Sequence, residues 1–148
     1  MANSIITTIL QDGPRNTRIK VTGILDTSDL AYTVIANPAT LSFVDQPRGL
    51  RATQLRVNKI DYDVEDGLDV RVLWGNTVPA NAPLLYDFVG RGMVDNDRYN
   101  DWNNTQAAGF DGTIAIATQG WSTGGIYEFS LTFTLVKQNP NAGQFNFG

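Results

Sequence analysis

The strict alternation of apolar and polar side chains over residues 127–136 constrains the fold more than any other feature of the sequence. The apolar positions are Tyr127, Phe129, Leu131, Phe133 and Leu135. Successive side chains of a β-strand point to opposite faces of a sheet, so this spacing predicts a strand with one buried and one solvated face. Strands of that kind belong to antiparallel sheets. No window of the chain has the apolar spacing of an amphipathic helix.

Further strand-like segments recur along the chain, separated by turns rich in Gly, Pro, Asn and Asp. They cover residues 4–10, 17–25, 31–36, 54–64, 68–74, 84–89 and 112–118. Residues 41–44 form either a short strand or an irregular apolar plug. About seven to nine short strands at regular spacing predict an all-β domain. We expect a single antiparallel β-sandwich, and the jelly-roll is among the topologies that fit.

The segment over residues 54–74 has the pattern of a β-hairpin. Its two arms alternate between apolar and polar residues, and the Glu-Asp-Gly sequence of residues 65–67 separates them. Gly67 can adopt the positive φ that tight hairpin turns require. The parity of the apolar positions changes between Val57 and Ile60, which predicts a β-bulge between these two residues.

The composition indicates one acidic domain without catalytic machinery. The chain of 148 residues fits a single domain, which we place at residues 1–137 and follow with a polar tail over residues 138–148. Histidine and cysteine are absent, which removes histidine-dependent nucleophiles, thiolate metal sites and disulfides. The net charge of −4, without clustered basic residues, argues against nucleic acid as a partner. Neither a secretory signal nor a membrane-spanning apolar run is seen, so we expect synthesis in a cytoplasm.

Two groups of carboxylates are candidates for acid–base or metal chemistry. The first lies in the predicted hairpin and comprises Asp61, Asp63, Glu65 and Asp69. It offers the paired carboxylates of a glycosidase, but its spacing is also that of a solvated strand face, which we favour. The second comprises Asp95, Asp97 and Asp101. Tyr99 and Asn100 stand where a calcium-binding EF-hand loop needs an oxygen donor and a glycine. We therefore expect no catalytic residue, no metal site and no cofactor. A looser calcium site in this second group stays open as the alternative.

Three aromatic side chains in predicted loops are candidates for stacking on a sugar ring: Tyr99, Trp102 and Trp121. Asp101, Asn103 and Asn104 would add hydrogen-bonding groups beside them. The alternative, which we favour, is that Trp102 folds back and covers the open end of the sandwich. Trp74 ends an alternating strand and is expected in the core.

The two ends of the chain are candidates for contacts with other subunits. The polar tail contains two large apolar rings, Phe145 and Phe147. Either the tail is a frayed end, or these rings form an arm that docks on a neighbour. Ordering a residue costs about 1–2 kcal/mol, so such an arm contributes little to a monomer and more to an assembly. The strand over residues 4–10 is rich in β-branched residues and is suited to pair with the sheet edge of another chain.

Two parts of the sequence resemble small virion structural proteins of tailed bacteriophages. The closer resemblance lies in residues 5–16 (IITTILQDGPRN) and 20–29 (KVTGILDTSD). A looser one lies in residues 57–64 (VNKIDYDV) and 70–74 (VRVLW). The resemblance implies a structural role in the virion, as a capsid decoration (cement) protein or as a head–tail or tail accessory protein.

The sequence and the resemblance together predict a non-enzymatic virion protein. We expect a capsid decoration protein that forms homo-oligomers, binds the major capsid protein or other virion proteins, and stabilises the assembled head. No nucleic acid and no membrane is expected as a partner. Two alternatives stay open: a carbohydrate-binding β-sandwich module that uses the loop aromatics, and a tail or neck accessory component.

Overall fold

The computed structural model describes residues 3–13, 16–41, 54–79, 82, 84–95 and 110–138. Within this part the chain forms nine β-strands and a three-residue 3₁₀ helix. Their bounds are β1 (Ser4–Asp12), β2 (Asn16–Leu25), β3 (Thr33–Ala36), η1 (Pro38–Thr40), β4 (Gln54–Val64), β5 (Asp69–Asn76), β6 (Leu84–Phe88), β7 (Arg91–Asp95), β8 (Phe110–Gln119) and β9 (Tyr127–Gln138). None of the described residues belongs to a helix long and apolar enough to cross a membrane.

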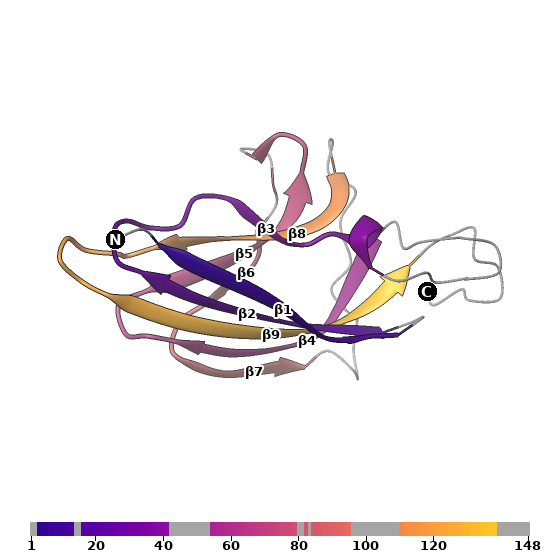
Figure 1. Ribbon diagram of the computed structural model, residues 1–148, viewed down its shortest axis with the longest axis horizontal. Helices are drawn as coiled ribbons and strands as arrows, with labels where there is room; N and C mark the ends of the chain where they lie inside the picture. The colour runs from indigo at the N-terminus through magenta and orange to yellow at the C-terminus, as the bar shows by residue number, and fades with distance from the viewer. Residues whose placement is uncertain are drawn as a thin grey trace.

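The strands form an antiparallel β-sandwich, as expected. One sheet has five strands in the order β1-β2-β9-β4-β7, and the other has four in the order β3-β8-β5-β6. Figure 1 shows the five-stranded sheet as the lower layer, with β1 in indigo crossing in front of β2. Strands β2 to β9 have the arrangement of an eight-stranded jelly-roll, in which β2-β9-β4-β7 faces β3-β8-β5-β6. β1 is therefore an additional strand attached to the edge of a jelly-roll.

The core lies between the inner faces of the two sheets, where the alternation placed it. β9 pairs with β2 on one side and with β4 on the other, so it runs through the centre of its sheet. The buried apolar side chains of its inner face are those of Phe129, Leu131, Phe133 and Leu135. Ile19, Val21 and Leu25 of β2 are also buried. Trp74 of β5 is in the core, as expected, with 3% of its surface exposed. Full burial of such a side chain contributes about 1.5–3 kcal/mol.

The hairpin predicted over residues 54–74 is wrong, because its two arms belong to different sheets. β4 lies in the five-stranded sheet and β5 in the four-stranded sheet. The turn between them is an arch from one layer to the other. Its first residues bond to other segments: Val64 N–H donates to Gly90 O at 2.7 Å, and Glu65 N–H donates to Glu128 O at 3.1 Å. The strand in each arm was nevertheless predicted correctly. Both an arch and a hairpin connect strands in which apolar and polar residues alternate, so the pattern within each arm is the same in the two cases.

β4 lies between β9 and β7, and its pairing differs on the two sides. The predicted bulge is confirmed, since the register of β4 against β9 shifts between Val57 and Lys59. On its other side β4 pairs with β7, which is not among the strands that the sequence predicted. The β7 sequence RGMVD is short and does not alternate, so periodicity could not reveal it. Residues 96–109 lie outside the described residues.

Candidate interaction surface

The outer edge of the five-stranded sheet is formed by β1. This strand pairs with β2 along its length, from Ser4 opposite Ile24 to Asp12 opposite Thr17. On its other side no strand of the described residues pairs with it. A free edge presents unpaired backbone N–H and C=O groups to any strand that approaches. The edge of β1 is thus a candidate surface for strand addition.

The side chains of β1 are exposed on both faces of the sheet, except that of the half-buried Ile5. The exposed fractions are 58% for Ile6, 49% for Ile9 and 48% for Leu10. Ile9 lies opposite Ile19 in the ladder, and opposite residues of an antiparallel pair share a face. Ile19 is buried, so Ile9 points to the inner side and is nevertheless exposed. The described part of the four-stranded sheet therefore does not cover β1, which fits its place outside the jelly-roll.

Over most of its length β1 lacks the devices that protect edge strands, and the two it has lie near its end. Natural edges are short, or they carry charges, proline or bulges that discourage pairing. Among the other edges of the described sheets, β3 has four residues, β6 contains Asp87, and β7 begins with Arg91 and ends with Asp95. β1 has nine residues, and Asp12 at its end is the only charged one. A register shift near that end is the one irregularity in its ladder with β2.

The start of β1 is fixed by Asn3, the residue just before the strand. Its side-chain oxygen accepts hydrogen bonds from Asp26 N–H at 3.0 Å and from Thr27 N–H at 3.1 Å. Its side-chain nitrogen donates to Ser28 O at 3.1 Å. One amide side chain thereby ties the beginning of β1 to the turn that follows β2.

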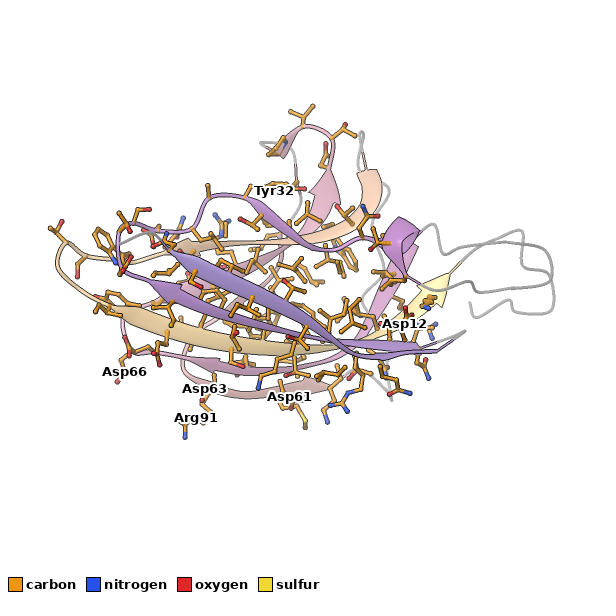
Figure 2. All side chains as sticks on the ribbon, in the orientation of Figure 1. Asp12, Tyr32, Asp61, Asp63, Asp66 and Arg91 are labelled. Atoms are coloured by element: carbon orange, nitrogen blue, oxygen red, sulfur yellow. The ribbon has the colours of Figure 1, made fainter. Side chains whose placement is uncertain are left out.

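The other end of β1 is fixed by Lys137 of β9, which has no exposed surface. Its ammonium group donates to the Asp12 carboxylate and, at 2.6 Å, to Gly13 O. Thr17 Oγ1 adds a hydrogen bond to Gln11 O at 2.8 Å. Figure 2 shows Asp12 at this end of the sheet. A buried ammonium group requires such partners, so Lys137 joins the end of β1 to the central strand.

Gly23 of β2 allows β1 to pack on the core. In the two ladders, Gly23 lies opposite Ile5 of β1 and opposite Phe129 of β9. A Cβ atom at Gly23 would lie 2.4 Å from Cε1 and Cζ of Phe129 and 2.9 Å from Cδ1 of Ile5. Because Gly23 has no side chain, both neighbours lie over the backbone of β2. Ile5 is the one residue of β1 that is partly buried for this reason.

An open groove of about 840 Å³ lies beside β1 on the outer face of the five-stranded sheet. It is lined by Ser4 and Ile6 of β1 and by four carboxylates: Asp63, Glu65, Asp66 and Glu128. Arg91 Nε lies 3.3 Å from Asp63 Oδ1, with both side chains more than half exposed. Figure 2 shows these two and Asp61 pointing away from the sandwich. They form the solvated strand face that the sequence indicated, and an exposed ion pair contributes only about 0–1 kcal/mol.

Asp69, which the sequence grouped with these carboxylates, lies in the other sheet, on β5. Its Oδ1 is buried and accepts no hydrogen bond from the residues that the structure describes. Burial raises the pKa of the Asp69 carboxyl above its usual range, the Asp87 carboxylate raises it further, and Arg71 opposes the shift. The carboxylates are thus divided between two sheets. The described residues contain no cluster of three or more side chains able to hold a metal ion.

Of the predicted aromatic site, Trp121 lies within the described residues. Its ring is half-buried against the core, and its Nε1–H donates to Gly125 O at 3.0 Å. Its backbone N–H donates to Asp29 Oδ1 at 3.0 Å. These contacts hold the loop that Trp121 belongs to. Other predicted residues lie outside the described residues: Asp97, Tyr99, Asp101, Trp102, Phe145 and Phe147.

Sequence reasoning identified the strand at residues 4–10 but missed the residues that hold it. Lys137 had a detectable signal, because it continues the alternation of β9 at a position that the pattern assigns to the core. A lysine at such a position is almost never fully buried without a partner. Asn3 and Gly23 had no comparable signal, since their roles depend on contacts between separate segments.

Comparisons with known proteins add little to this description. No protein-family model and no curated protein sequence matches the chain. Among solved structures, one described as "CBM4 structure and function" aligns over 90% of this chain and 94% of that chain, with 10% sequence identity and a TM-score of 0.31. A likeness at this identity and TM-score does not indicate a function.

Proposed function

We propose that the protein is a non-enzymatic structural component of a tailed-phage virion, and specifically a capsid decoration protein. The observation that carries the proposal is β1, an edge strand of nine residues that is exposed on both faces and fixed at both ends. Such an edge binds other chains by extending its sheet. The closer resemblance to virion proteins, in residues 5–29, covers this strand and its partner β2.

A decoration protein needs a rigid body and a surface for other subunits rather than a reaction centre. Main-chain hydrogen bonds along β1 give affinity, and many equivalent sites on one shell multiply weak contacts. The partners proposed are the major capsid protein and sister subunits, and the location is the virion. The jelly-roll fold does not distinguish a capsid protein from a carbohydrate-binding protein, because it occurs in both capsid proteins and lectins.

Co-sedimentation with phage heads assembled without this protein tests the proposal. We expect the wild-type protein to sediment with heads up to a fixed number of copies and not to sediment with isolated tails. Ile6→Lys places a charge on β1 and should weaken binding at least tenfold. Ile126→Lys is the matched control, because Ile126 is 63% exposed and lies outside β1. It should bind like the wild type.

Two results would contradict the proposal. One is the absence of binding to any part of the virion. The other is equal binding by the two lysine variants, which would separate the function from β1. Binding to tails in place of heads would support the tail or neck position instead.

A further inference from the structure

We propose that the partner of β1 is the β1 strand of a second copy of this chain, paired antiparallel about a two-fold axis at Thr7. This inference rests on the proposed function, since it takes the same edge as the assembly surface and names its occupant. The result is a dimer in which the two five-stranded sheets become one continuous sheet.

The sequence of β1 is self-complementary about Thr7. A two-fold axis perpendicular to the sheet at Thr7 places the Thr7 residues of the two copies opposite each other. A residue that precedes Thr7 by a given number of positions in one strand then lies opposite the residue that follows Thr7 by the same number in the other. Ile5 then faces Ile9, and Ile6 faces Thr8. All five side chains are β-branched, and β-branched residues fit the pleated surface best and stabilise cross-strand pairs.

The faces of the sheet agree with this register. Ile5 and Ile9 lie opposite Gly23 and Ile19, so both point to the inner side of the sheet. In the symmetric pair, Ile5 of one copy meets Ile9 of the other on that side. Ile9 is 49% exposed in the single chain because the second layer does not cover it. Each copy therefore covers apolar surface that the sandwich of the other leaves exposed.

The distribution of charge also favours a second copy at this edge. The chain has a net charge of −4, so its acidic surfaces repel their own copies. The groove carboxylates Glu128 and Asp63 lie on β9 and β4, two and three strands away from β1, so pairing at this edge does not bring them opposite their copies. No charged residue lies between Ser4 and Gln11, and Asp12 is already paired with Lys137. Like charges directly opposite each other destabilise strand pairs, and this edge places none in register.

Charge variants at the axis test the inference, because a residue on the axis faces its own copy. Thr7 is exposed, so substitution there leaves the fold of the single chain intact. By light scattering, we expect the wild type to have twice the chain mass of 16.2 kDa. Thr7→Lys and Thr7→Glu should each be monomeric, and their equimolar mixture should recover the dimer. Thr123→Lys, in an exposed turn, is the control and should stay dimeric.

A cysteine series tests the register. The chain contains no cysteine, so a single introduced thiol has no competitor. Thr7→Cys should form an intermolecular disulfide on mild oxidation, because opposite Cβ atoms lie about 4.5–5.5 Å apart. Ser4→Cys should not, because the two thiols would be six residues, or about 20 Å, apart along the strands.

The outcomes separate this inference from the proposed function. A monomeric wild type, or a dimer that Thr7→Lys does not dissociate, overturns the inference. A monomer that binds heads through β1 would show that the shell protein occupies the edge. A dimer with these properties that binds no part of the virion would leave the inference standing and remove the proposed function.

Discussion

Replacing Gly23 with alanine tests how β1 is held on the core. The new Cβ atom would lie 2.4 Å from two ring carbons of Phe129, whereas carbon atoms in contact prefer about 3.5–4.0 Å. The ring must move by about 1 Å or more, and Phe129 is only 3% exposed. Overpacking of this kind costs about 1–3 kcal/mol, and replacing glycine in a strand returns about 0.5–1 kcal/mol. We therefore expect a net loss of about 1–2 kcal/mol.

Urea and thermal unfolding of Gly23→Ala measure this loss. For a domain of this size, each kcal/mol lowers the melting temperature by about 2–4 °C, so the expected decrease is about 2–8 °C. Hydrogen exchange of the β1 amides should also become faster, because the added methyl group also lies 2.9 Å from Ile5 Cδ1.

A double-mutant cycle identifies the steric cause. Phe129→Leu shortens the side chain, so Gly23→Ala should cost less in that background, with a coupling of at least about 0.5 kcal/mol. The reasoning is refuted if Gly23→Ala unfolds at the wild-type midpoint, or if the effects of the two substitutions simply add.

Three further substitutions probe the core and the buried charges. Phe133→Ala removes a fully buried ring and should cost about 3–5 kcal/mol, so a variant that melts like the wild type would contradict the core assignment. Lys137→Met removes the buried ammonium group that donates to Asp12 and to Gly13 O, and the loss of these charged hydrogen bonds should cost about 1–3 kcal/mol in urea unfolding. Unchanged stability would show that the two bonds contribute nothing. Burial, and to a smaller extent the Asp87 carboxylate, raise the pKa of Asp69 in the folded protein above its value in the unfolded chain. Between these two pKa values the folded protein holds the proton more tightly than the unfolded chain, so the free energy of unfolding falls as the pH rises. Asp69→Asn should therefore be more stable than the wild type near neutral pH but not in acid below the unfolded pKa, and a gain independent of pH would argue against this.

Alternation along the sequence predicted the strands and their buried faces, but it did not predict their partners. In residues 54–74 the periodicity and the glycine turn suit an arch as well as a hairpin. The choice depends on β9, which pairs with β4 although the two are remote in sequence. β7 escaped detection because a short edge strand with Arg91 and Gly92 needs no apolar face of its own.

For the interaction surface, the sequence predicted a strand at residues 4–10 that is suited to pair with another chain. It did not show that β1 is the outermost strand, because strand order depends on contacts remote in sequence. Nor did it show that Ile9 points inward without cover, which depends on the unequal widths of the two sheets. The anchors Asn3 and Lys137 bring together segments that no local pattern connects.

The central place of β9 has a consequence for the order in which the protein can fold. β9 is the last described strand to leave the ribosome, yet it separates β2 from β4 in the finished sheet. Until it has been synthesised, β1 and β2 form at most an isolated two-stranded hairpin, which is marginally stable in water. Both edges of that hairpin stay open, and pairings between remote strands form slowly. The edge of β1, which is proposed to bind other subunits, is therefore exposed before the domain has folded. Incomplete chains are for this reason the species most prone to aggregate.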